Sequence, residues 1–139
     1  MAITQLSVFL ENRPGTLAEL TGYLAGKNIN LQALSVADTQ DFGVVRLITE
    51  DSEAALAALM EDGYICKLND VLAVAVDDKA GALAKTLQVL DAIGASVEYL
   101  YASLSSTAGR AFLILKVKEA EAAREALVKA GIELVEDLR

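Results

Sequence analysis

Residues 12–30 read NRPGTLAELTGYLAGKNIN, and this stretch decides the fold. Its leucines recur at spacings of three and four, the period of an amphipathic helix, at Leu17, Leu20 and Leu24. Proline suits the first helical position, and asparagine tolerates the left-handed conformation that ends many helices. The pattern therefore predicts a helix from Pro14 to about Lys27, stopped by Asn28.

The start of this predicted helix is a candidate binding site. Gly15 follows Pro14 and lets a neighbour approach the backbone closely, so we expect the N–H groups of Gly15 and Thr16 to be free donors. Free donors at the positive end of a helix dipole bind small carboxylates or phosphates. A purely structural interpretation stays open at this point, because asparagine and proline are also common in turns and at helix starts.

The chain contains the same pattern twice, 66 residues apart. Asn12 to Leu17 aligns with Asp78 to Leu83, and Asn28 aligns with Gly94. The alternating apolar residues before the loop also correspond, with Leu6, Val8 and Leu10 aligning with Leu72, Val74 and Val76. A repeat of this length indicates one folding unit used twice.

Each copy predicts the element order βαββαβ. The first copy comprises strands 3–10, 29–37, 44–49 and 64–68, and helices from 14 to 27 and after Asp51 or Ser52; a turn at residues 38–41 joins its middle strands. The second copy comprises elements 71–76, 80–93, 96–104, 110–117, 120–129 and 132–135. The expected class is α+β, with two tandem ferredoxin-like domains, antiparallel sheets and helices on one face. We place the domains at 1–68 and 69–139, without a linker, and expect them to pack together.

Composition limits the possible functions. The chain has 139 residues, 54% of them hydrophobic, a net charge of −8, no histidine and one cysteine. The negative charge disfavours nucleic acid, and no apolar run approaches the ~20 residues that span a bilayer. Without histidine or a nucleophile–base motif, we expect no enzyme activity, no metal and no cofactor. We expect a cytoplasmic protein, in which Cys66 is a buried thiol.

Two asparagines lie at opposite ends of the first predicted helix. At about 1.5 Å per residue, Asn12 and Asn30 should be roughly 20 Å apart. One small ligand cannot touch both within a single domain. If both bind the same ligand, that ligand must lie between two domains, one supplying the loop and the other the strand start. Ser96 is the counterpart of Asn30 in the second copy.

The loop Asn12 to Leu17, the helix and the segment Asn28 to Asn30 resemble the ACT domain, and in particular the regulatory ACT domain of D-3-phosphoglycerate dehydrogenase. This resemblance implies a βαββαβ module that binds amino acids between paired ACT domains, with Asn12 and Gly15 on one side and Asn30 of a partner domain on the other. The candidate ligand-binding set is Asn12, Arg13, Pro14, Gly15, Thr16, Leu17 and Asn30. A possible second set is Asp78, Lys79, Gly81, Ala82 and Ser96.

These observations predict a non-catalytic regulatory protein that binds a small ligand, most simply an amino acid. We expect a homodimer that regulates a separate enzyme of amino-acid metabolism. A ligand-free interaction module that recruits such an enzyme is the alternative. A small enzyme using Arg13 and Asp78 is a third hypothesis, disfavoured by the missing nucleophile–base pair.

Overall fold

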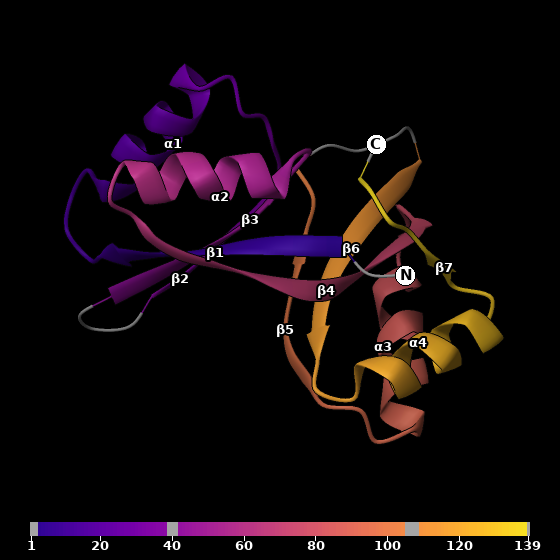
Figure 1. Cartoon of the computed structure of the whole chain (residues 1–139). Helices are drawn as coiled ribbons and strands as arrows, with labels where there is room; N and C mark the ends of the chain where they lie inside the picture. Colours follow the sequence, from indigo (N-terminus) through magenta and orange to yellow (C-terminus); the bar gives the residue numbers. More distant parts are fainter. Residues whose placement is uncertain (1–2, 39–41, 105–108, 139) are drawn as a thin grey trace. The chain divides into compact units, whose positions relative to one another are not determined.

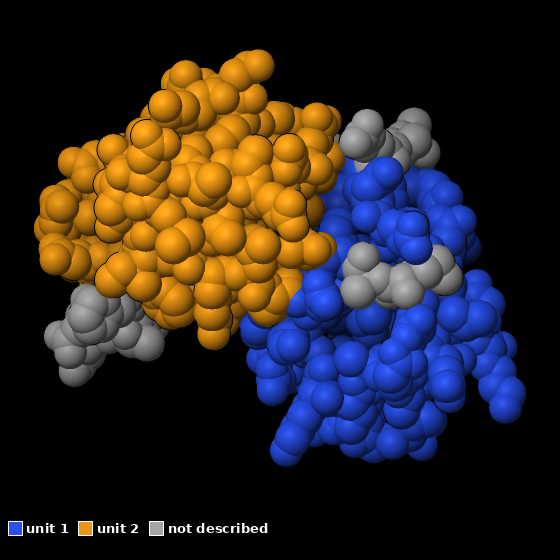
Figure 2. All heavy atoms as spheres, in the orientation of Figure 1, with its two compact units in different colours: residues 1–3, 70–139 blue, residues 4–69 orange. Residues whose placement is uncertain are grey.

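The computed structural model describes residues 3–38, 42–104 and 109–138. The chain forms two compact units, coloured separately in Figure 2. Thr4–Asn69 forms the amino-terminal unit, and Asp70–Arg139 together with Met1–Ile3 forms the carboxy-terminal unit.

The amino-terminal unit has the predicted element order (Figure 1). Its elements are β1 (Ile3–Glu11), α1 (Thr16–Gly26), β2 (Leu31–Asp38), β3 (Phe42–Thr49), α2 (Ser52–Glu61) and the first part of β4 (Ile65–Asp77). The strand order is β2-β3-β1-β4, and β3 pairs antiparallel with both β1 and β2. Residues 39–41 of the predicted turn lie outside the described residues, but Asp38 pairs with Gly43, as a hairpin requires.

The carboxy-terminal unit repeats this arrangement. It comprises the second part of β4, α3 (Ala82–Ala92), β5 (Val97–Ala102), β6 (Arg110–Val117), α4 (Ala120–Lys129) and the short β7 (Glu133–Leu134). β6 pairs antiparallel with β4 and β5, and β7 pairs antiparallel with β4. The α+β class with two ferredoxin-like domains is therefore confirmed.

One predicted break between strands is wrong. Residues 64–68 and 71–76 were expected to form two strands, but β4 runs continuously from Ile65 to Asp77. Asn69, which commonly favours turns, uses its side chain differently here. The side-chain Oδ1 of Asn69 accepts hydrogen bonds from the side-chain amide of Gln5 and the hydroxyl of Ser7, both in β1, each at 3.3 Å. This side-chain bonding holds Asn69 within an extended strand.

The leucines of the helices fill the cores. Leu20 and Leu24 of α1 and Leu59 of α2 are fully buried against alternating residues of β1 and β3. The carboxy-terminal core is built in the same way, from Leu90 of α3 and Leu127 of α4 packed on β4 and β6. In each unit both helices thus pack on one face of the sheet, as the period of their leucines predicts.

The predicted helix stop is also present. Asn28 has a φ of +59°, the left-handed conformation expected just after a helix. The Ile29 N–H donates to the Leu24 carbonyl at 2.9 Å and closes the last turn. Gly94 ends α3 in the same way, with the Ala95 N–H donating to the Leu90 carbonyl at 3.1 Å.

Candidate functional site

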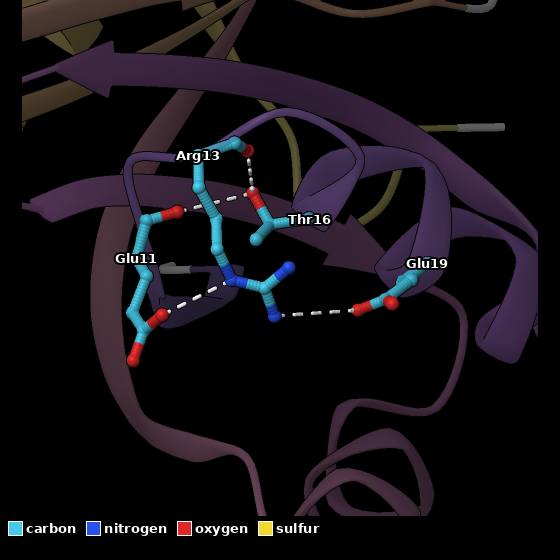
Figure 3. A network of polar contacts seen from close by, with 4 residues as sticks. All are labelled: Glu11, Arg13, Thr16 and Glu19. Carbon is cyan, nitrogen blue, oxygen red and sulfur yellow. Dashed lines mark hydrogen bonds and ion pairs between the residues drawn. The ribbon is translucent and has the colours of Figure 1, made fainter.

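The loop between β1 and α1 is fixed by its own polar groups. Gly15 has a φ of +92°, so it stands outside the right-handed helix, which begins at Thr16. The prediction that Pro14 starts the helix is therefore wrong by two residues. The Thr16 hydroxyl donates to the carbonyls of Glu11 and Arg13, each at 3.1 Å (Figure 3). These bonds fold the loop back on the strand that precedes it.

The free donors of the helix start match the prediction at Gly15 but not at Thr16. The Thr16 N–H is not free, because it donates to the Arg13 carbonyl at 3.4 Å. Within the described part of the chain, the N–H groups of Gly15, Leu17 and Ala18 have no acceptor. A Cβ placed on Gly15 would meet no atom of the described chain within 4 Å. A glycine is required at position 15 by the left-handed φ and not by crowding from another part of the chain.

Arg13 is held by two carboxylates. Its Nε lies 3.1 Å from Glu11 Oε2, and its Nη2 lies 4.0 Å from Glu19 Oε2 (Figure 3). All three side chains are well exposed, so these ion pairs contribute little to stability. They do cancel the charge of the guanidinium beside the loop. Because its charge is already balanced by carboxylates, Arg13 does not attract an anionic ligand to this loop as an unpaired cation would.

The loop borders a hollow of about 270 Å³, which we call the amino-terminal hollow. Most of the first predicted set lines it, namely Asn12, Arg13, Gly15, Thr16 and Leu17. Pro14 and Asn30 do not line it. Asn30 is exposed beyond the far end of α1, as the length of the helix predicts.

The sequence-based set missed the apolar wall of this hollow. Leu10, Val36 and Val45 contribute to the lining. Val36 pairs with Val45, and Val45 pairs with Val8, so the three valines form a row across β2, β3 and β1. Val36 is half exposed at 50%. The alternation of apolar residues in these strands was a usable signal, but the register that brings them together required the structure.

The carboxy-terminal unit has a hollow beside the corresponding loop. It measures about 490 Å³, and we call it the carboxy-terminal hollow. Lys79, Gly81 and Ala82 of the second predicted set line it. Asp78 and Ser96 do not. The Ser96 N–H instead donates to the Glu119 carboxylate at 2.6 Å, away from the loop.

Charged residues of this second hollow were not predicted. Asp77 and Arg110 are paired across β4 and β6, Lys85 lies in the first part of α3, and Glu133 belongs to β7. The Gly81 φ of +91° matches that of Gly15, so the two helix starts share one backbone conformation. The two hollows therefore share a loop but differ in their charged lining.

Cys66 is partly buried in β4, and burial raises the pKa of its thiol above the ordinary value of 9.0. At pH 8 the folded protein should react more slowly with DTNB than the urea-unfolded chain, because the thiolate is the nucleophile. The stabilising effect of the raised pKa is present below pH 9 and is lost as pH rises through the folded value. Equal rates in folded and unfolded protein would contradict this prediction.

The described residues contain neither a cluster of metal ligands nor a helix suited to a membrane. No group of three or more cysteine, aspartate or glutamate side chains there could hold a metal ion. Nor does any described helix combine the length and apolar character needed to cross a membrane.

Two ferredoxin-like units, each with a hollow at its first helix start, define a tandem pair of small α+β domains. The chain belongs to the ACT domain pair family, whose model matches residues 1–139. The predicted ACT resemblance is thus confirmed. The finer resemblance to the domain of D-3-phosphoglycerate dehydrogenase stays a prediction.

Similar solved structures share this fold. Protein BT0572 from Bacteroides thetaiotaomicron is 36% identical, with a TM-score of 0.89 over 97% of this chain and 92% of that one. The ligand-free regulatory subunit of aspartate kinase from Thermus thermophilus is 21% identical, with a TM-score of 0.66 over 91% of each chain. The corresponding subunit from Thermus flavus is 22% identical, with a TM-score of 0.60 over 92% of each chain. No curated protein matched the chain.

Proposed function

We propose that the protein is a non-catalytic regulatory protein that binds an amino acid at its helix-start loops. The observation that carries this proposal is the lining of the amino-terminal hollow. Three N–H donors without an acceptor in the described chain lie at the start of α1, beside a wall of apolar side chains. An α-amino acid has the matching groups, a carboxylate and a side chain on one small skeleton.

The chemistry of each part supports an amino acid. The N–H groups of Gly15, Leu17 and Ala18 lie at the positive end of the helix dipole and would hold the α-carboxylate. The ligand side chain would lie against Leu10 and Val36. Glu11 and Arg13 leave the lining without net charge, which suits a neutral zwitterion.

The size of the hollow also favours a small ligand. Pockets for drug-sized molecules and cofactors occupy about 300–1,000 Å³. The amino-terminal hollow, at about 270 Å³, falls just below this range. This volume is sufficient for a single amino acid, which is smaller than a drug-sized molecule.

A non-catalytic role fits the hydroxyl group at this site. The Thr16 hydroxyl donates to two backbone carbonyls, so it is committed to the loop. Nucleophilic catalysis needs a base within hydrogen-bond reach of such a hydroxyl. In the lining of the amino-terminal hollow, the carboxylate that could act as such a base is that of Glu11. This carboxylate is paired with Arg13.

We further propose that Asn30 of another ACT domain completes the binding site, in a cytoplasmic homodimer. Asn30 is exposed and lies outside the hollow of its own unit, which is compatible with a role across an interface. Two solved relatives are named as regulatory subunits of aspartate kinase, and their fold is shared. A separate enzyme of amino-acid metabolism is accordingly the proposed target of regulation.

A thermal-shift screen of the twenty amino acids tests this function. A ligand that binds only the folded state adds RT ln(1 + [L]/Kd) to its stability, about 2.7 kcal/mol at one hundred times Kd. We expect at least one amino acid to raise Tm in a saturable manner at millimolar concentration. If all twenty leave Tm unchanged, the proposed ligand class is wrong.

The alternative function is a ligand-free interaction module that recruits a metabolic enzyme. The exposed apolar side chain of Ile65, at 72%, is the observation that favours it. Co-purification of an enzyme whose binding no amino acid alters would support this alternative. Loss of that enzyme on adding an amino acid would instead support ligand-controlled regulation.

A further inference from the structure

The carboxy-terminal hollow is lined by charged side chains from several elements. Its charged lining consists of Asp77 at the end of β4, Lys79 in the loop, Lys85 in α3, Arg110 in β6 and Glu133 in β7. The apolar part comes from small or buried residues, among them Ala75 and Ile132. The lining thus carries three cations and two carboxylates, a local net charge of +1 in a chain of net charge −8.

Two of the three cations are already paired. Arg110 Nη2 lies 2.6 Å from Glu133 Oε2, and Lys79 Nζ lies 3.6 Å from Asp77 Oδ2. The Arg110 and Asp77 backbones are also partners across β4 and β6. These contacts place both carboxylates and both cations at the same end of the sheet.

Lys85 supplies the unbalanced charge. It is exposed in the first part of α3, and within the described residues its ammonium has no carboxylate partner. The N–H groups of Gly81, Leu83 and Ala84 at the same helix start also have no acceptor among the described residues. Of these groups, Lys85 and the residue Gly81 line the hollow, so a cation and one free N–H donor lie where an anionic group would be stabilised.

We propose that the carboxy-terminal hollow binds an amino acid with an acidic side chain. This inference rests on the proposed amino-acid-binding function and specifies the ligand class of the second unit. An acidic amino acid carries two carboxylates and one ammonium, a net charge of −1 that complements the lining. One carboxylate binds at the start of α3, where Gly81 lines the hollow, and the other binds Lys85, the cation of the lining that has no carboxylate partner among the described residues. The ligand ammonium lies by Asp77 and Glu133.

Other ligand classes fit this lining less well. A neutral amino acid has no second carboxylate for Lys85. Inorganic phosphate and succinate have no ammonium, so they would leave Asp77 and Glu133 facing a ligand of their own sign. A basic amino acid would add a cation to an already positive hollow. The amino-terminal hollow, whose Glu11 and Arg13 cancel, lacks this preference.

Calorimetric titration of the full chain with L-aspartate and L-glutamate tests the proposal. Lys85→Gln removes the unpaired charge and should weaken binding about tenfold, the value of one charged hydrogen bond in a partly exposed site. Lys118→Gln removes one lysine charge from the same unit, just beyond the opposite end of β6, and should leave affinity unchanged. Succinate and inorganic phosphate should bind more weakly than either amino acid.

A third variant separates this proposal from the proposed function. Val36→Glu alters only the amino-terminal hollow, so aspartate binding should survive it. Three results would overturn the inference alone: aspartate binding lost in Val36→Glu but kept in Lys85→Gln, no aspartate binding while another amino acid binds, or phosphate binding more tightly than aspartate. Failure of every amino acid to bind would overturn both proposals.

Discussion

Gly15→Ala should lower the free energy of unfolding by about 1–2 kcal/mol, whereas Gly22→Ala, seven residues away, should raise it by about 1 kcal/mol. Gly15 has a φ of +92°, which costs any residue with a Cβ that amount of strain. Gly22 lies inside α1, and a Cβ there would meet nothing within 4 Å. Alanine at Gly22 therefore adds helix propensity without a clash.

Urea unfolding of both variants and the wild type measures this difference, about 2–3 kcal/mol between the two substitutions. Gly81→Ala, with the same φ in the carboxy-terminal unit, should resemble Gly15→Ala. Similar unfolding energies for Gly15→Ala and Gly22→Ala would show that the left-handed loop is not present in solution. The Gly15 variant should also bind amino acid more weakly, because its strain is relieved by moving the helix-start donors.

Val36→Glu should reduce the affinity of the amino-terminal hollow for a neutral amino acid by about tenfold to a hundredfold. Val36 belongs to the apolar wall, so the substitution places a carboxylate where the ligand side chain packs. The side chain is half exposed, and its replacement should therefore change stability only slightly. Calorimetric titration with the best amino acid of the thermal-shift screen gives the affinity.

Val128→Glu is the matched control for this substitution. Val128 lies in α4, is 54% exposed compared with 50% for Val36, and lines neither hollow. Both variants gain one negative charge, so any general electrostatic effect is shared. If the two variants lose affinity equally, the apolar wall does not contact the ligand.

The fold was predictable from the sequence because its signals are local. The spacing of Leu20 and Leu24 predicted which face of α1 is buried, and both side chains are fully buried. Asn28 predicted the end of that helix, and its positive φ confirms it. The repeat then carried the same arrangement to the second unit, where Leu90 occupies the place of Leu24.

Other features depend on contacts between distant residues. β4 is continuous because Asn69 bonds side chains of β1, a contact that no local pattern indicates. The start of α1 shifted because Gly15 takes a positive φ, which outweighs the preference of Pro14 for the first helical position.

The candidate site was predictable only along its loop. Residues adjacent in sequence, such as Gly15 and Thr16, line the amino-terminal hollow as expected. Val36 reaches the same hollow through the register of β2 on β3, and Arg110 meets Asp77 through the register of β6 on β4. Registers are set by whole-sheet packing, so these residues could not be assigned from spacing alone.

Titration of ¹⁵N-labelled protein with its best amino acid, followed by NMR, tests directly whether the helix-start loop binds the ligand. We expect saturable shifts of the backbone amide signals of Gly15, Leu17 and Ala18, since their N–H groups are the proposed donors to the ligand carboxylate. A saturable response confined to residues outside the helix-start loops, with these three signals unmoved, would contradict it.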